Sequence, residues 1–487
     1  MSERNHQNER SNVSERTFMS ERFFPTVTPL ALALAAALAL SGCMSLAPKY
    51  VRPAAPVAAT FPNAPLGVGT ATGAAQIGWQ TFFADARLKQ LISLALANNR
   101  DLRVSILNIE QARAQYQIRR ADVLPTVNAA VSGSRLPGAN ETISSSYSAG
   151  VGVSAFELDL FGRVRNLSEA ALAQFLATEE ARNSAQISLI GSVANTYLAV
   201  LADDELLALT MQTLAGREAA LKLIVLKYDN GVLSRLDLAQ GQSLVDSARV
   251  ALAQQQRQRA QDANVLVLLV GQMLPDTLAP GTTLALTELA ELPAGLPSEL
   301  LAVRPDIRAA EQLLIGANAN LGAARANFFP RIALTGSAGS ASSALSGLFK
   351  AGSFGWTFAP QVVLPIFDGG RNNANLGSAR AGRDIALAQY ERSIQGAFRE
   401  LADALAVQAT FAAQLRAQRA VAAAEAERFT LSELRYRAGV ASYLDLLDAQ
   451  RSLYGAQQAA VQANLQRLQN QVTLYRVLGG GWSDAAL

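Results

Sequence analysis

The chain has 487 residues, of which 50% are hydrophobic and 17% are charged, and its formal net charge is +3. The length allows several domains, and the near balance of charge gives no indication of a polyanionic partner such as a nucleic acid. Cys43 is the only cysteine and His6 the only histidine, which excludes an internal disulfide, a zinc site of the His/Cys type and a histidine-dependent triad. No pair of carboxylates is isolated in an apolar stretch. We therefore expect no catalytic site, no metal and no cofactor.

A short apolar run, Leu30–Leu40, predicts a secretory signal peptide over residues 1–42. The run follows Arg16 and Arg22 and is shorter than the ~18–20 residues of a spanning helix. A buried core helix is the alternative. Because Met19-Ser-Glu-Arg repeats the opening Met1-Ser-Glu-Arg, translation starts at either Met1 or Met19.

The small-residue segment Leu40-Ser41-Gly42-Cys43 resembles the cleavage site of bacterial lipoproteins. That resemblance implies cleavage before Cys43 and acylation of its thiol and amine, for example with palmitate. Met44 follows the cysteine, where an aspartate would favour retention in the inner membrane, so the resemblance points to the outer membrane. Residues 43–84 then carry several prolines and are predicted to form a lipid-anchored tether.

The rest of the chain consists of two copies of one long unit. Three pairs of similar segments lie roughly 205 residues apart, and self-similarity at such a distance indicates a duplicated domain. We assign residues 85–273 to the first repeat, 274–303 to a proline-containing linker, 304–480 to the second repeat and 481–487 to a C-terminal tail. The paired segments are Arg120–Pro125 with Arg325–Pro330, Leu158–Asn166 with Leu364–Asn372, and Lys227–Leu244 with Arg435–Leu453.

Each repeat contains two stretches in which apolar and polar residues alternate, as in a strand with one apolar face. These stretches lie at about residues 126–134, 144–157, 331–339 and 353–363. Their length suits tilted strands that cross a bilayer, although two hairpins on a soluble core are the alternative. Four strands in lipid would leave two unpaired edges, and closing a barrel takes at least ~8 strands. Several protomers must therefore share one barrel if the strands cross a membrane.

Two stretches without proline, Asn166–Tyr228 and Asn372–Tyr436, predict helices ~95–100 Å long at 1.5 Å per residue. Helices of this length suggest coiled coils. Their alanine-rich faces suit close packing in a ring of helices around a lumen. Shorter helices are expected at Leu88–Ala121, Leu236–Val270, Pro305–Asn327 and Leu444–Leu478.

Several segments together resemble the outer-membrane efflux lipoproteins of the TolC/OprM type, also called outer membrane factors of the NodT type. They are Leu40–Cys43, Ala47–Pro53, Arg304–Gln312 with Asn318–Pro330, and Leu364–Gly370. The resemblance implies a mixed α+β membrane fold with four transmembrane strands per protomer. A homotrimer would form a twelve-stranded barrel in the outer membrane, continued by a long α-helical barrel in the periplasm.

The same resemblance implies a passive duct with no enzymatic activity, in a tripartite efflux system that exports drugs or other toxic small molecules. The implied partners are a periplasmic adaptor protein and an inner-membrane pump, commonly of the resistance-nodulation-division class. A duct for type I protein secretion is the nearest alternative within the family. The lipid anchor and the Arg304–Gln312 segment favour pump-driven export.

The resemblance also points to a gate at the periplasmic end. Asp445 and Asp448 resemble the acids nearest the pore axis, Asp237 their counterpart in the first repeat, and Tyr436 the tyrosine of an inter-helix lock. Helix capping is the alternative role for each aspartate. Ala441 stands where a relative has an arginine of that lock, and Arg437 and Arg235 are possible substitutes.

Overall fold

The computed structural model describes residues 45–58, 77–137, 143–290, 292 and 303–482. The predicted signal peptide, Cys43, part of the tether and linker, and the end of the tail lie outside the described residues. The description below concerns the unit that begins at Ser45.

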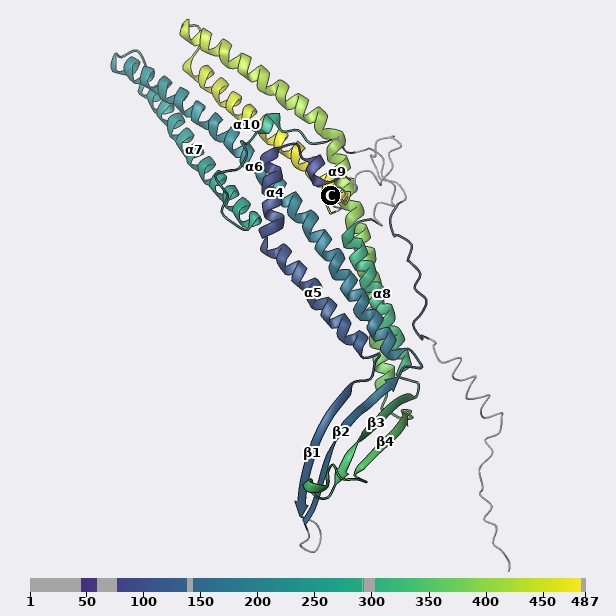
Figure 1. Ribbon diagram of the computed structural model, residues 1–487. Helices are drawn as coiled ribbons and strands as arrows, with labels where there is room; N and C mark the ends of the chain where they lie inside the picture. Colours follow the sequence, from purple (N-terminus) through teal and green to yellow (C-terminus); the bar gives the residue numbers. More distant parts are fainter. Residues whose placement is uncertain (1–44, 59–76, 138–142, 291, 293–302, 483–487) are drawn as a thin grey trace, which may run out of the picture. The chain divides into compact units, whose positions relative to one another are not determined.

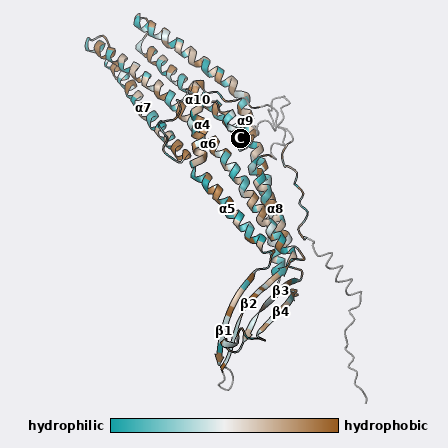
Figure 2. Ribbon diagram, in the orientation of Figure 1, coloured by the Kyte–Doolittle hydropathy of each residue, from teal (hydrophilic) through white to brown (hydrophobic). Residues whose placement is uncertain are grey.

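Two long helical hairpins dominate this unit (Figure 1). The first hairpin consists of α6 (Arg163–Asp229) and α7 (Arg235–Val270), and the second consists of α9 (Arg371–Arg437) and α10 (Tyr443–Val477). α6 and α9 each contain 67 residues, or ~100 Å of helix. α10 packs against α6, so the two hairpins touch. Figure 2 shows apolar and polar residues interspersed along the long helices.

The two hairpins begin and turn in the same way, as expected of duplicated units. Gly162 and Gly370, both in the left-handed region with φ of 73° and 86°, precede α6 and α9. A residue with a Cβ would be strained there. α7 and α10 each start with a reciprocal capping box, Ser234 with Asp237 and Ser442 with Asp445. α6 has one apolar window of membrane-spanning length, yet most of that window is buried inside the protein.

Shorter helices brace the hairpins. α5 (Arg100–Ala121) packs on α6, whereas α8 (Pro305–Ala326) lies against both α6 and α9. Arg304 precedes α8, and its side chain contacts two other helices. Its guanidinium pairs with Asp306 at 2.7 Å and Glu400 at 3.2 Å, and it donates to the carbonyl of Val477 at 3.1 Å. This one side chain therefore ties the start of α8 to α9 and to the end of α10.

The largest apolar core surrounds α6 and α10. α3 (Trp79–Phe82) and α4 (Ala86–Asn98) add to this core. Phe82 stacks on Tyr475 with ring centroids 4.0 Å apart, and the Tyr475 hydroxyl donates to the carbonyl of Ile77 at 2.6 Å. The predicted linker also contributes, because Leu284 is fully buried in this core.

Four strands form one antiparallel sheet in the order β1-β2-β3-β4. Their bounds are β1 (Val127–Pro137), β2 (Ile143–Leu158), β3 (Arg331–Ser342) and β4 (Phe354–Val363). β2 and β3 come from different repeats, so the central pairing joins the two copies. A register shift between Val153 and Phe156 includes Ala155 at φ 51° and bends β2.

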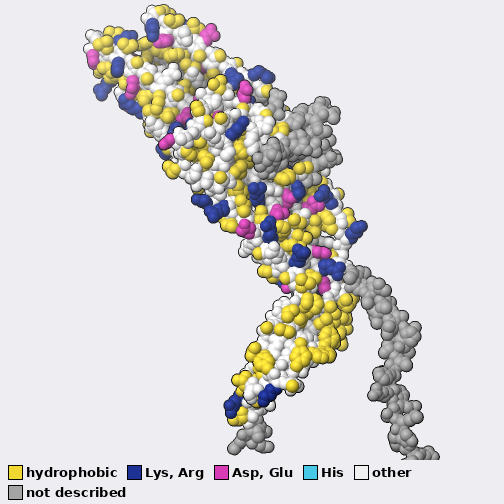
Figure 3. All heavy atoms as spheres, in the orientation of Figure 1, with side chains coloured by type: hydrophobic (Ala, Val, Ile, Leu, Met, Phe, Trp, Pro, Cys, Tyr) yellow, Lys and Arg dark blue, Asp and Glu magenta, His cyan; other side chains and the backbone are white. Residues whose placement is uncertain are grey.

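The sheet exposes large apolar side chains to its surroundings. Val131 on β1 and Phe354, Trp356 and Phe358 on β4 are all at least 63% exposed. Figure 3 shows hydrophobic side chains over the visible face of the sheet, whereas charged side chains are scattered over the helices. Exposed aromatic rows of this kind suit a lipid environment. Within the described residues, β1 and β4 are each paired on one side only.

An N-terminal strap, residues 45–52, is held along α8 and the start of α6. Ser45 donates to Asn166 at 2.8 Å. Glu311, which is only 8% exposed, accepts from the Tyr50 hydroxyl at 2.9 Å and from Arg52 at 2.7 and 2.6 Å. A Cβ at Gly322 would lie 2.6 Å from the Cβ of Ala47. The strap therefore depends on the absence of a side chain at Gly322.

We expect Gly322→Ala to displace the strap, although alanine ordinarily stabilises a helix by up to ~1 kcal/mol relative to glycine. Hydrogen exchange of residues 45–52, measured by mass spectrometry, should become faster. Gly377→Ala on α9 is the matched control, because a Cβ there meets no atom within 4 Å. Equal protection of the strap in the wild type and in Gly322→Ala would contradict the assignment.

Candidate functional site

The turns of the two helical hairpins lie at the same end of the unit (Figure 1), and we call this end the hairpin tip, defined by residues 224–247 and 428–450. Both turns pass through a glycine in the left-handed region, Gly231 at φ 71° and Gly439 at φ 72°. A small apolar cluster of Ile224, Leu244, Tyr443 and Leu447 joins the hairpins there. Burial raises the pKa of Tyr443 to about 12, so its hydroxyl stays neutral at physiological pH.

Tyr436 is held by a lysine from the first repeat. The Lys227 ammonium lies 4.9 Å from the centroid of the Tyr436 ring and 3.5 Å from its hydroxyl. The centroid of the Tyr443 ring lies 5.6 Å from that of the Tyr436 ring. Neither of the arginines considered above takes this place in the described structure: Arg437 ion-pairs with Glu433 at 2.6 Å, and no contact joins Arg235 to Tyr436.

The three candidate aspartates differ in their surroundings. Asp237 and Asp445 belong to the capping boxes, in which one carboxylate oxygen accepts from the backbone and hydroxyl of Ser234 or Ser442. These hydrogen bonds lower the pKa of both carboxyls, so both remain charged. The capping alternative is thus observed for Asp237 and Asp445. A cap keeps the negative charge at the tip, so it does not exclude a gating role.

Asp448 takes no part in a cap. Its carboxylate ion-pairs with Arg428 of α9, which also contacts Glu425 at 3.1 Å. Neither Arg428 nor Lys227 was predicted from the sequence. For Lys227 a signal was available, since it occupies the position in the first repeat that Arg435 occupies in the second.

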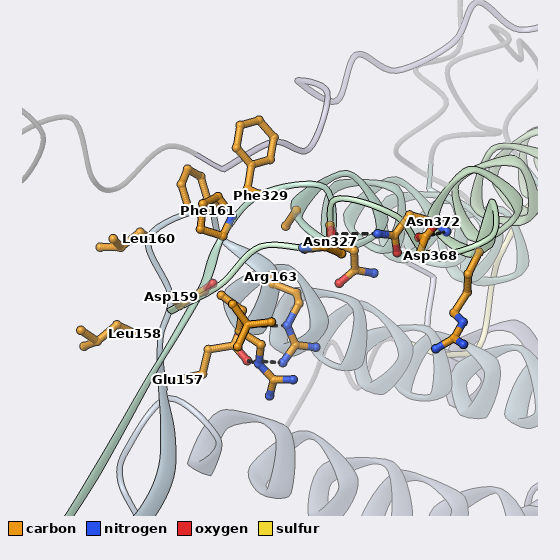
Figure 4. A pocket seen from close by; sticks show the side chains of 16 residues that line it. Glu157, Leu158, Asp159, Leu160, Phe161, Arg163, Asn327, Phe329, Asp368 and Asn372 are labelled. Atoms are coloured by element: carbon orange, nitrogen blue, oxygen red, sulfur yellow. Dashed lines mark hydrogen bonds and ion pairs between the residues drawn. The ribbon is translucent and has the colours of Figure 1, made fainter. Parts of the chain in front are cut away.

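A second polar site lies where the strands meet the long helices (Figure 4). It is a cavity of about 270 Å³ lined by the ends of β2, β3 and β4 and by the starts of α6 and α9. Glu157 accepts from Arg163 at 2.8 and 2.7 Å and pairs with Arg331 at 2.5 Å. Phe161 and Phe329, one from each repeat, stack at 4.7 Å. These contacts hold the sheet to the hairpins, so the site acts as a joint.

No group of three or more His, Cys, Asp or Glu side chains in the described ranges is arranged to hold a metal ion. Asp237, Asp445, Asp448 and Glu157 are each engaged in a capping box or an ion pair. The geometry supports mechanical contacts between helices and charge placed at the end of a bundle.

Comparison with known proteins agrees with this geometry. Two segments, residues 91–272 and 296–480, match the outer membrane efflux protein family. A Pseudomonas putida protein described as the probable efflux pump outer membrane protein TtgC is 49% identical over 453 residues, covering 91% of this chain and 93% of that protein. The outer membrane protein OprJ of Pseudomonas aeruginosa is 46% identical, covering 91% and 94%.

The solved structures agree as well. The open state of the Neisseria gonorrhoeae MtrE outer membrane channel has a TM-score of 0.84 at 42% identity, covering 90% of this chain and 99% of that chain. The fold therefore defines a TolC-like outer-membrane channel of the mostly helical α+β class. The chain belongs to the outer membrane efflux protein family, a family of transport conduits.

The Lys227–Tyr436 contact gives a prediction about the tip. Lys227→Met keeps the alkyl chain but removes the cation, and an exposed cation–π contact contributes ~0.5–1 kcal/mol. We expect amide exchange over residues 435–440 to become about two- to fivefold faster. Lys222→Met, on an exposed position of the same helix, is the control. Unchanged exchange in Lys227→Met would show that the lysine does not hold the tyrosine.

Proposed function

We propose that three copies of this chain form a passive conduit through the outer membrane, as the channel component of a tripartite efflux system. The observation that carries the proposal is the sheet. Its four strands are too few to close, its surface is apolar, and its two edges are unpaired within the described residues. Lipid cannot satisfy backbone donors and acceptors, so a shared barrel of twelve strands satisfies both edges of each protomer.

The helices supply the periplasmic part of this conduit. α6 and α9 contain 67 residues each, and in a trimer the hairpins would form a long helical barrel. We propose that Cys43 carries the lipid anchor, with residues 1–42 removed. The hairpin tip would meet a periplasmic adaptor, which links it to an inner-membrane pump of the resistance-nodulation-division class.

The cargo class is small toxic molecules. Relatives of 46–49% identity are named for efflux pumps, and one at 49% identity is named for toluene efflux. We place cargo selection in the inner-membrane pump. The conduit then needs only a bore and a closable end.

Deletion of the gene in its own host tests this function. We expect intracellular accumulation of a fluorescent efflux substrate to rise several-fold, and expression of the intact gene from a plasmid to reverse the rise. A plasmid copy with Cys43→Ala in the same signal should restore export poorly if the anchor is needed. Unchanged accumulation together with loss of a secreted protein would instead favour the type I secretion duct.

We propose that Asp445 and Asp448, repeated by threefold symmetry, surround the pore at the hairpin tip, with Tyr436 and Asp237 on the contact between hairpins. Rings of carboxylates favour cations. Asp445→Asn/Asp448→Asn should therefore weaken both cation preference and block by trivalent cations in planar-bilayer recordings of purified trimers. Asp276→Asn/Asp384→Asn, at two exposed positions outside the tip, is a charge-matched control. If Asp445→Asn/Asp448→Asn kept the ion selectivity of the wild type, the two aspartates would not line the pore, and Asp445 would act only in its capping box.

A further inference from the structure

A second polar contact joins the hairpins at a distance from the tip. Thr210 and Arg217 of α6 face Tyr454 of α10. Tyr454 lies nine residues beyond Asp445 in the sequence, or ~14 Å along the helix. Nothing in the capping boxes, the ion pairs of the tip or the Lys227–Tyr436 contact involves these three side chains.

The donor and the acceptor of each hydrogen bond around Tyr454 can be assigned. The Thr210 hydroxyl donates to the carbonyl of Leu206 at 2.7 Å, and the amide of Gln458 donates to the Tyr454 hydroxyl at 2.9 Å. The remaining contact, 2.8 Å between the two hydroxyls, must then have Tyr454 as donor and Thr210 as acceptor, since each hydroxyl has a single proton. Thr210 is 1% exposed, so water cannot readily replace Tyr454.

Arg217 is a buried cation without an acidic partner. It is 7% exposed, and within the described residues no carboxylate pairs with it. Nη1 donates to the carbonyl of Leu244 on α7 at 3.0 Å, the guanidinium carbon lies 5.8 Å from the Tyr454 ring centroid, and Nε has no partner. Burial lowers the pKa of Arg217, and the nearby Arg451 lowers it further.

These two parts of the contact have opposite effects on the packing of the hairpins. The Tyr454–Thr210 hydrogen bond is made only while α10 lies against α6, so it favours contact. A guanidinium that is buried without a counter-charge is destabilised by loss of water, at a cost of several kcal/mol. The cation–π contact with the Tyr454 ring offsets only ~0.5–2 kcal/mol of this cost. We therefore infer that Arg217 on balance favours separation, which would let water reach its guanidinium.

We propose that Thr210, Arg217 and Tyr454 form a second latch between the hairpins, in which Tyr454 holds the second hairpin and Arg217 limits how tightly it is held. As a gating element the latch rests on the proposed conduit function. As a contact between hairpins it can be tested without any transport. The three side chains are positioning residues, because they act through the angle between α6 and α10 and touch no cargo.

Two substitutions of neighbouring residues should shift the tip in opposite directions. Tyr454→Phe removes the donor and should make amide exchange over residues 436–450 about three- to tenfold faster, the range expected for one net hydrogen bond. Arg217→Met keeps the length of the side chain and removes the charge, so exchange over the same residues should become slower. A purely structural role would make both variants exchange faster.

The controls use detergent-extracted full-length trimers. Arg249→Met removes an exposed α7 arginine that pairs with Glu218 and should leave the tip unchanged or slightly looser. Thr210→Val should raise the amide exchange rate as much as Tyr454→Phe does. The double variant should exchange no faster than either single variant, because both changes remove the same hydrogen bond. This cycle keeps the test decisive if Arg217→Met fails to assemble.

Faster exchange in Arg217→Met, or additive effects of Thr210→Val and Tyr454→Phe, would overturn the latch. Failure of the gene-deletion experiment would leave these exchange results unaffected, so the two proposals fail separately. Conductance measurements on the same trimers test whether the latch also acts in gating. Tyr454→Phe and Arg217→Met should change the open fraction in opposite directions, and a change in the same direction would refute the gating role.

Discussion

The pairing of the backbone along β1 and β4 is the constraint on which the rest of the architecture depends. A sheet edge in lipid costs several kcal/mol for each unsatisfied group, and one protomer has two edges of ten residues or more. In the proposed trimer, closure between copies would solve this problem and place each sheet in the wall of one symmetric barrel. The long helices follow directly from the strand ends through the Glu157 joint, so their arrangement would share that symmetry.

The duplication gives the two hairpins the same backbone but different chemistry. Both turns have a left-handed glycine and a capping box. Gln240 occupies in the first repeat the position of Asp448 in the second, and Ala220 that of Arg428. The ion pair next to the tip therefore belongs to the second repeat alone. In the proposed trimer, this ion pair would occur three times, whereas identical hairpins would give six copies.

Local patterns predicted much of the fold. Period-two alternation located the four strands, and the absence of proline located α6 and α9 to within a few residues of their ends. These features depend on neighbours in the sequence. The pairing of β2 with β3 could not be derived in the same way, since it joins residues of different repeats, and neither could the strap on α8.

The candidate site was predicted less completely. The capping alternative for Asp237 and Asp445 followed from their position at the start of a helix after Gly231 or Gly439. The partners of Tyr436 and Asp448 did not, because Lys227 and Arg428 reach them from other helices. A single sequence gives the type of a side chain but not which distant helix faces it, and electrostatic contacts across helices depend on that packing.

The strap has a consequence for the order in which the protein matures. Glu311 on α8 is almost fully buried, and its carboxylate is satisfied by Tyr50 and Arg52. Until the strap docks, the hydrogen bonds of this carboxylate must be made with water, because Tyr50 and Arg52 both belong to the strap. The beginning of the described chain thus completes a helix that is synthesised some 260 residues later. The strap must therefore stay free until α8 has formed, and a chain whose strap is misplaced would expose on α8 an acid that the finished protein covers.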